Sequence, residues 1–509
     1  MRSKLLKLNT FTSLLYQVVV IVCSFILPRQ ILGVFGSDTN GLVNSITQFL
    51  QFIGLLELGV GAVVESSLYK PLADRDYVTI SKVMSSGQKF FNSIARILLG
   101  YVALLCAVYP LLAHQDYGWM YTALLIVAIS ISSFAQYYFG IVNSILIRAD
   151  QHGYVQYTIQ TVTIVLNTVA CVLLIRLGAS IHIVKLTTSL IFLLRPLVLL
   201  MYVNRHYAIN RKIQYEGEPI KQKWNGIAQH VAAVVLDGTD NVVLTIFSTL
   251  ANVSIYSVYH LVIYGVKNLF MSLTNGIQSL IGELWAKQEL ELLNNTFGWF
   301  EWVLHTGTVF VFGCTGMLLL PFVSVYTAGV TDANYIQPLF AVLLTMANAG
   351  HCLRLPYSVM ILAGGHYQQT QHSYIIAAVM NVVLSVVLVI RFGLIGVAIG
   401  TLTAMIYQTV WMAWYVSKNL NHWPFHRFIK QMVVDMLSVV IATVASRWIT
   451  LVSISYASWI LMAVKVVLIW IAVIIPINIV FYRYYVVKSI LVCKEKVVMF
   501  FRKWRGMHK

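Results

Sequence analysis

Apolar runs of membrane-spanning length follow one another along almost the whole chain, and this pattern restricts the fold more than any other feature. A helix needs about 20 apolar residues to cross a bilayer, because its backbone polar groups must be satisfied within the segment. By this length we expect fourteen spans, near residues 8–33, 42–67, 89–112, 119–147, 155–176, 182–204, 227–250, 253–282, 299–324, 337–362, 373–391, 394–416, 431–451 and 457–482. The sequence therefore predicts an all-α polytopic membrane protein with about 14 transmembrane helices.

The composition and the placement of charge agree with this prediction. Of 509 residues, 59% are hydrophobic and 10% are charged, whereas a soluble protein has about 25% charged residues. The net charge of +17 does not indicate a nucleic-acid partner. By our assignment about 25 of the 35 Lys and Arg residues lie in alternate loops and at the termini, the distribution expected of cytoplasmic segments. We expect a multi-pass protein of the cell membrane with both termini cytoplasmic and the excess charge facing anionic lipids.

A weak internal repeat indicates two similar halves. Residues 149–154, Asn167 and residues 176–178 resemble residues 363–367, Asn381 and residues 391–393, in the same order. Because the offset spans six helices, the copies have the same orientation and form parallel repeats, which we expect to make two lobes around a central cavity. We assign the chain as an N-lobe (1–204), a cytoplasmic linker (205–226), a C-lobe (227–416), two added helices (431–482) and a basic, amphipathic cytoplasmic tail (483–509).

One apolar run, residues 253–282, carries a lysine near its middle. A charge at the bilayer centre costs about 2.5 to 3.5 kcal/mol on insertion scales, so Lys267 is expected to line a cavity or to form an ion pair between helices. The helical period places several polar side chains on one face, namely Tyr256, His260, Tyr264, Lys267, Thr274 and Gln278. The preceding run carries Asp237 and Asp240, which could supply counter-charges.

Three more charged side chains lie within predicted spans. Arg29 follows Pro28, and a kink beside a cation suits a moving gate, although Arg29 is also close enough to the surface to reach it. Arg354 lies near Pro356 and is either a cavity cation or a residue that reaches the interface. Glu57 lies near mid-membrane and could carry a proton or form an ion pair.

Other intramembrane charges are expected nearer to interfaces or to helix contacts. They are Arg96, Arg195, Asp435, Arg447 and Lys465.

Built-in catalytic and cofactor motifs are missing from the sequence. There is no GxxxxGK[ST], no HExxH and no cysteine spacing suited to zinc, and no loop can hold a soluble catalytic domain. We therefore expect a protein that is not an enzyme and has no cofactor. Its energy would come from the substrate's own gradient or from coupling to protons, sodium or the membrane potential. Buried cations suggest an anionic substrate, and Tyr-rich and Gln-rich faces suit sugars.

Four segments resemble the polysaccharide-repeat-unit flippases (Wzx-like; O-antigen, capsule and exopolysaccharide) of the multidrug/oligosaccharidyl-lipid/polysaccharide (MOP) exporter superfamily. These are residues 36–41, residues 55–61 leading to 67–72, residues 253–259 and residues 326–335. The resemblance implies a two-lobed twelve-helix core that flips undecaprenyl-diphosphate-linked oligosaccharide from the inner to the outer leaflet by alternating access. Lys267, Arg354 and Arg29 would then hold the diphosphate.

The resemblance also suggests partners and roles for other segments. A polysaccharide polymerase and glycosyltransferases are possible partners in cell-surface polysaccharide synthesis. The last two helices could form a groove for the lipid tail, as in lipid II flippases of the superfamily. Two alternatives stay open: a membrane-embedded polysaccharide polymerase or ligase, which the short outer loops disfavour, and a MATE-type drug/ion antiporter, which the lack of an acid in the first span disfavours.

Overall fold

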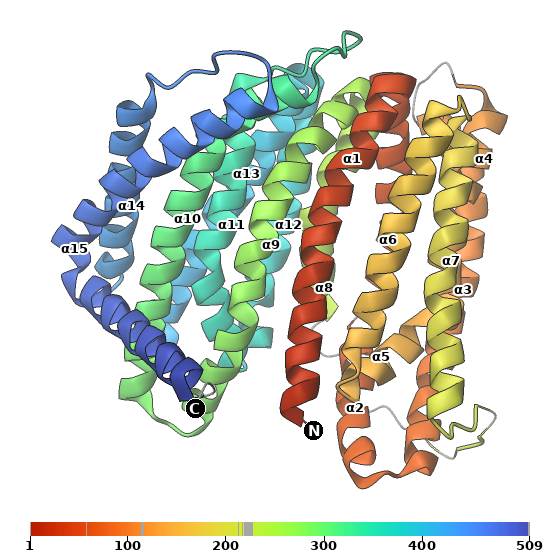
Figure 1. Ribbon diagram of the computed structural model, residues 1–509, viewed down its shortest axis with the longest axis horizontal. Coiled ribbons are helices and arrows are strands. Elements are labelled where there is room, and N and C mark those ends of the chain that lie inside the picture. Colours follow the sequence, from red (N-terminus) through yellow and green to blue (C-terminus); the bar gives the residue numbers. More distant parts are fainter. Residues whose placement is uncertain are drawn as a thin grey trace. The chain divides into compact units, whose positions relative to one another are not determined.

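A computed structural model describes residues 2–57, 59–112, 117–211, 213–215, 217 and 227–506. All the secondary-structure elements in the described ranges are helices (Figure 1). The helices are α1 (Arg2–Gln51), η1 (Phe52–Glu57), α2 (Val60–Asp74), α3 (Tyr77–Leu112), α4 (Trp119–Ala135), η2 (Gln136–Gly140), α5 (Ile141–Ala149), α6 (Gly153–Arg176), α7 (Ile181–His206), α8 (Ile227–Phe247), α9 (Leu250–Ala286), α10 (Leu290–Tyr326), α11 (Pro338–Ala363), α12 (Tyr367–Phe392), α13 (Leu394–Asn419), α14 (His426–Ser446) and α15 (Tyr456–Gly506).

The predicted all-α membrane architecture is confirmed. Within the described residues, eleven helical segments are long and apolar enough to cross a membrane, and one of them, Lys7–Glu57, covers the first predicted span and part of the second. All fourteen predicted spans fall on helices, with α8 and α9 occupying spans seven and eight. The predicted basic tail is helical to Gly506, and its side chains from residue 490 onward lie outside the description.

Between the first two predicted spans, residues 8–33 and 42–67, the chain forms no loop but a one-residue break inside α1. Gly36 has φ 82° and ψ 176°, a backbone geometry that favours glycine. A Cβ there would lie 2.8 Å from Oδ2 of Asp332. Asp332 accepts hydrogen bonds from the backbone N–H of Ser37 (2.6 Å) and from its hydroxyl (2.7 Å). A carboxylate from a distant loop thus caps the second half of α1, which explains why no local sequence signal marks the restart.

Two further irregularities interrupt predicted spans. The second span breaks into the 3₁₀ helix η1 and then α2, with Gly59 at φ 76° between them. The fourth span contains the π-helical turn η2. Turns of this kind often mark functional positions in helices.

The chain divides into two compact units. Unit 1 comprises residues 1–261, 329–335 and 374–400, and unit 2 comprises residues 262–328, 336–373 and 401–509. In unit 1, α6 packs against α1 and α7, and α4 packs against α3 and α7. In unit 2, α10 packs against α11, α14 and α15, around a core in which Trp470 is fully buried. Figure 1 shows the bend of α15, which lies at Tyr482.

Helices α6 and α12, which carry the predicted repeat, have matching features. They are 24 and 26 residues long, and Asn167 and Asn381 are buried at corresponding positions. Each helix is followed by a glycine with positive φ, Gly178 at 78° and Gly393 at 51°. We would expect the two copies of a duplicated helix to keep such similar ends.

Candidate functional site

A cavity of about 800 Å³ lies within unit 1. Side chains from α1, η1, α2, α4, η2, α5, α6 and α7 line it, so both irregular turns contribute to its wall. Three basic residues line it, Arg148, Lys185 and Arg195, against one acidic residue, Glu57. The remaining polar wall includes Gln51, Gln136, Gln156 and Gln160. The cavity therefore carries an excess of positive charge within helices of membrane-spanning character.

Arg195 is the cation with unused hydrogen-bonding capacity at this wall. Its Nε donates to Oγ1 of Thr163 at 2.7 Å, and its guanidinium lies 3.8 Å from the centre of the Phe192 ring. Its Nη2 is buried and has no hydrogen-bond partner among the described residues. A buried donor of a charged group is costly to leave unpaired. An anionic ligand in the cavity would satisfy it.

Two of the neighbouring charges of the cavity, Arg148 and Glu57, have partners. Arg148 forms an ion pair of 3.1 Å with Glu65, a residue outside the cavity lining. The hydroxyl of Tyr137 donates to Oε1 of Glu57 at 2.7 Å. Because Tyr137 belongs to η2 and Glu57 to η1, this bond joins the two irregular turns. The predicted candidate Glu57 thus lies in the wall of a cationic cavity.

Two of the predicted cavity cations come together in unit 2. Lys267 on α9 and Arg354 on α11 are 6% and 7% exposed, and both interact electrostatically with His351. Nη2 of Arg354 is 3.1 Å from Nδ1 of His351, and its Nη1 donates to Gln408. Nε2 of His351 and Nε2 of Gln408 are buried without a partner among the described residues. This cluster is basic and has spare donor capacity.

The other predicted residues lie in several places. The hydroxyl of Tyr256 donates to Asp240 at 3.0 Å, and the Tyr256 ring stacks on His260, all within unit 1. Arg29 is half-buried on α1, with its guanidinium against Gly33.

The remaining three candidates do not come together in one site among the described residues. Tyr264 is 44% exposed, and Gln278 is half-buried on α9. Asp237 lies on α8, but its side chain falls outside the described residues. The polar face predicted for residues 253–282 is therefore not uniformly buried, because α9 passes from unit 1 to unit 2 after Leu261.

Sequence reasoning missed Arg195 and Lys185 as cavity residues. The signal for Arg195 was present, because Pro196 follows it and a cation beside a proline is the pattern that singled out Arg29 and Arg354. The expectation that Arg195 lies at an interface or helix contact overlooked this parallel.

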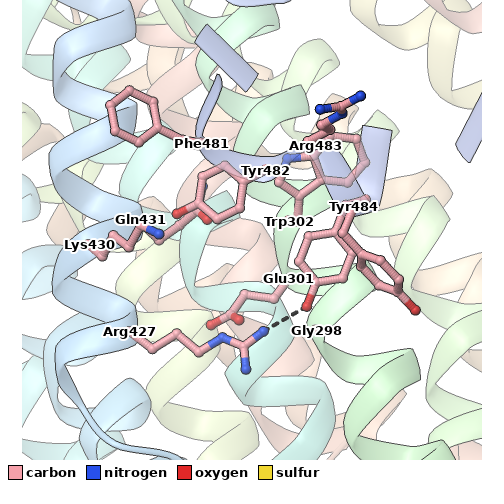
Figure 2. Close-up of a pocket in the computed structure, with 11 residues that line it drawn as sticks. Gly298, Glu301, Trp302, Arg427, Lys430, Gln431, Phe481, Tyr482, Arg483 and Tyr484 are labelled. Atoms are coloured by element: carbon pink, nitrogen blue, oxygen red, sulfur yellow. Dashed lines mark hydrogen bonds between the residues drawn. The ribbon is translucent and has the colours of Figure 1, made fainter. Parts of the chain in front are cut away.

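A buried acid and histidine in unit 2 were also missed. Glu301 and His305 are spaced four residues apart on α10, which places both on one face of the helix. Asp435, which was expected nearer to an interface or to a helix contact, is 6% exposed, and it contacts His305. Of these three residues, Glu301 lines a smaller pocket of about 300 Å³, drawn in Figure 2.

Comparisons by sequence identify no relatives, since no family model and no curated protein match the chain. Solved structures do match. The lipid II flippase MurJ in its inward closed conformation has a TM-score of 0.69 at 13% identity, covering 94% of this chain and 99% of that chain.

Two MATE structures also match. An inward-facing multidrug resistance MATE family transporter of the MOP superfamily has a TM-score of 0.60 at 15% identity, with 78% and 95% coverage. The bent form of the Vibrio cholerae MATE transporter VcmN has a TM-score of 0.55 at 14% identity, with 82% and 97% coverage. The chain therefore has the fold of the MOP transporters.

Proposed function

We propose that this protein is a secondary transporter that flips undecaprenyl-diphosphate-linked oligosaccharides from the inner to the outer leaflet by alternating access, for cell-surface polysaccharide synthesis. The observation that carries the proposal is the cavity of unit 1, with three basic side chains and one acidic one. A diphosphate presents several anionic oxygens, and guanidinium and ammonium groups bind such oxygens through strong, charge-assisted hydrogen bonds. The fold of a lipid II flippase supports the same class of substrate.

The glycan of the substrate needs hydrogen-bonding groups in addition to cations, and the cavity contains such groups. Four glutamines and the hydroxyls of Ser132 and Ser133 line the same wall. Amide and hydroxyl groups suit the hydroxyls of a glycan, because they both donate and accept hydrogen bonds. We assign phosphate binding to Arg195 and Lys185 in unit 1. Lys267, Arg354 and Arg29 stay proposed as further phosphate ligands on the transport path.

Ion coupling and partners complete the proposal. Glu57, Asp237 and Asp240 are candidates for coupling to protons or sodium. Anionic lipids are proposed to hold the basic tail, and a polymerase and glycosyltransferases are proposed to act before and after transport. The protein would reside in the cell membrane with both termini in the cytoplasm.

A MATE-type drug/ion antiporter is the second candidate, because two MATE structures share the fold. The charge of the cavity argues against cationic drugs as its substrates. With Arg148 paired to Glu65, Lys185 and Arg195 still outnumber Glu57, and this excess would repel a positively charged molecule and attract a negatively charged one.

The test is a translocation assay in proteoliposomes with a fluorescent undecaprenyl-diphosphate oligosaccharide. We expect the native protein to move the probe between leaflets faster than protein-free vesicles do, under an imposed ion gradient. Equal rates would refute the proposal. Growth of the glycan in the same vesicles would favour a polymerase, and gradient-driven efflux of a cationic dye would favour the antiporter.

A further inference from the structure

Unit 2 contains a buried polar network that the proposed function does not use. Four titratable side chains form it: Glu301 and His305 on α10, Tyr357 on α11 and Asp435 on α14. None is more than 8% exposed, and His305 is fully buried. Such groups are costly inside a membrane protein unless they are paired, so their arrangement needs an explanation.

The distances define a single chain of contacts. Oδ2 of Asp435 is 2.7 Å from Nδ1 of His305. Nε2 of His305 is 3.2 Å from the Tyr357 hydroxyl, which is 2.7 Å from Oε1 of Glu301. Gln431 holds the other oxygen of Asp435 at 3.0 Å. Asp435 is thereby fixed as an acceptor, and a proton on Nδ1 of His305 donates to it.

The positions of the protons in the other two contacts follow from counting them. Two contacts join Nε2 of His305, the Tyr357 hydroxyl and the Glu301 carboxyl group, and each contact needs one proton between its heavy atoms. The hydroxyl supplies one. The second must lie on Nε2 of His305 or on Glu301.

The two placements of this second proton are interconvertible. In one, protonated His305 donates to Tyr357, which donates to ionised Glu301. In the other, protonated Glu301 donates to Tyr357, which donates to neutral His305. The first converts to the second when the Nε2 proton passes to the hydroxyl oxygen and the hydroxyl proton passes to Glu301. No proton is gained or lost, and both contacts are satisfied in each form.

The two buried carboxyl groups of the network favour retention of this proton, whereas the cations of the pocket oppose it. Without it, the network would carry the negative charges of both Glu301 and Asp435 in a buried site. The cations that face it are Arg427 and Lys430 on α14 and Arg483 on α15, and the neighbouring phenols are Tyr482, Tyr484 and Tyr485, all of which line the pocket of about 300 Å³. Nη2 of Arg427 donates to the Tyr485 hydroxyl at 2.6 Å, and the guanidinium lies over the Trp423 ring.

The pocket provides a route for exchange. Figure 2 shows the Glu301 carboxyl group and the Arg427 guanidinium projecting into the same space, with Tyr482 and Trp302 around them. Glu301 is the member of the proton-sharing chain that lines this pocket, whereas Tyr357 and His305 do not.

We infer that Glu301, Tyr357 and His305 form a binding site for one exchangeable proton, which enters and leaves at Glu301 through the pocket beside Arg427. The proton also joins α10 to α11, so its loss weakens a contact between two membrane helices. Binding of the proton is independent of the proposed function. A part for it in driving transport rests on that function.

Glu301→Gln is the informative variant. The amide N–H of the introduced glutamine can donate to Tyr357 as protonated Glu301 does, so the variant keeps the contacts with neutral His305 but lacks the carboxyl group at which the proton is proposed to enter and leave. Glu65→Gln is the matched control, because Glu65 is a partly exposed carboxylate paired with Arg148 in unit 1. The measurement is thermal stability of the purified protein over a series of pH values, together with proton release on an alkaline step in weak buffer.

The native protein should lose stability as the pH rises through the pH of release, because the folded network holds there a proton that unfolded Glu301 and His305 have both given up. We expect the native protein and Glu65→Gln each to release one more proton per molecule than Glu301→Gln does. The same release and the same pH dependence in Glu301→Gln would overturn the inference.

A second variant provides the test if Glu301→Gln does not fold. Tyr357→Phe removes the shared hydroxyl and should shift the pH at which the proton is released by at least tenfold in proton concentration. Release of the proton at the same pH as in the native protein would contradict the inference. The translocation assay separates the two proposals: proton release without transport refutes only the function, and transport by a native protein that releases no such proton refutes only the proton site.

Discussion

At the residue scale, a cation beside a proline within a membrane helix recurs at three positions. Arg29 follows Pro28, Arg195 precedes Pro196, and Arg354 lies two residues before Pro356. The pattern predicts cations held inside the membrane, and Arg354 and Arg195 are indeed at buried or cavity-lining positions. The sequence cannot predict which of them share a site, because helical periodicity orders side chains around one helix and says nothing of the facing helix.

Lys267 illustrates both the reach and the limit of this reasoning. The cost of an intramembrane charge predicted that Lys267 lines a cavity or forms an ion pair, and its side chain is 6% exposed. Its neighbours His351 and Cys352 come from α11 and could not be predicted, since about 85 residues separate them from it in the chain.

The first prediction concerns Lys267 as a phosphate ligand. Lys267→Ala should lower the rate of translocation about 10-fold or more, because a hydrogen bond to a charged group contributes about 1.5 to 3 kcal/mol. Lys418→Ala is the control, since Lys418 lies at the end of α13 against the Trp414 ring. Equal initial rates for a folded Lys267→Ala and the native protein would remove Lys267 from the path.

At the element scale, the spans were predictable because their apolar length is a local property. Their breaks were not, because each depends on a distant partner. Gly36 turns the chain where Asp332 caps the next helix, and Gly140 lies where a Cβ would be 2.9 Å from Pro196 on α7. Neither approach leaves a mark in the neighbouring sequence.

Gly313 on α10 makes a similar approach and gives a stability prediction. A Cβ there would lie 1.8 Å from the ring of Trp470, which is fully buried on α15. Gly313→Ala should lower the free energy of unfolding by about 1 to 3 kcal/mol through overpacking.

The matched control for that variant is another helical glycine. Gly100→Ala on α3 places its Cβ in open space and should raise stability by about 0.5 to 1 kcal/mol, because alanine favours the helix. Thermal unfolding in detergent measures both. A Gly313→Ala variant as stable as Gly100→Ala would contradict the packing of α10 on α15.

Asp76, just before α3, gives a prediction with a pH dependence. The Thr79 hydroxyl, at 2.5 Å, and the backbone N–H groups of Thr79 and Val78 donate to its carboxylate and hold its pKa below the ordinary value. Because the folded pKa is the lower one, this stabilisation is present above the unfolded pKa of about 3.9 and is lost as the pH falls through the folded pKa.

Asp76→Ala should therefore unfold at a lower temperature than the native protein at pH 7. The difference should shrink as the pH is lowered below about 3.9. Asp74→Ala, which changes an exposed carboxylate at the end of α2, should leave the midpoint unchanged. A difference that persists unchanged in acid would show that Asp76 does not act as an ionised cap.

At the scale of the whole molecule, three of the segments that carry the family resemblance meet in unit 1. Ser37 contacts Asp332 and Tyr335, and the Tyr335 hydroxyl contacts that of Ser254 at 2.8 Å. Asn40 donates to Ser254 at 2.7 Å. The resemblance named these segments, but only the fold shows that they bind one another. The proposed alternating access would open this junction at one stage of the cycle.

Crosslinking tests this requirement. A protein with Asn40→Cys and Ser254→Cys should lose at least about 10-fold of its translocation rate on oxidation and regain it with a reductant. The two single variants should be insensitive to oxidation. Full transport by the crosslinked protein would show that the junction stays closed throughout the cycle.

The most direct test of the central claim, that a cationic cavity in unit 1 binds the diphosphate of a lipid carrier, is the affinity of purified protein for undecaprenyl diphosphate. We predict that the native protein binds it more tightly than undecaprenol, and more weakly as salt is raised. Arg195→Gln should bind it about 10-fold or more weakly, whereas Arg96→Gln, at an exposed position of α3, should bind as the native protein does. Equal affinity for the diphosphate and the alcohol, or an unchanged affinity in Arg195→Gln, would contradict the claim.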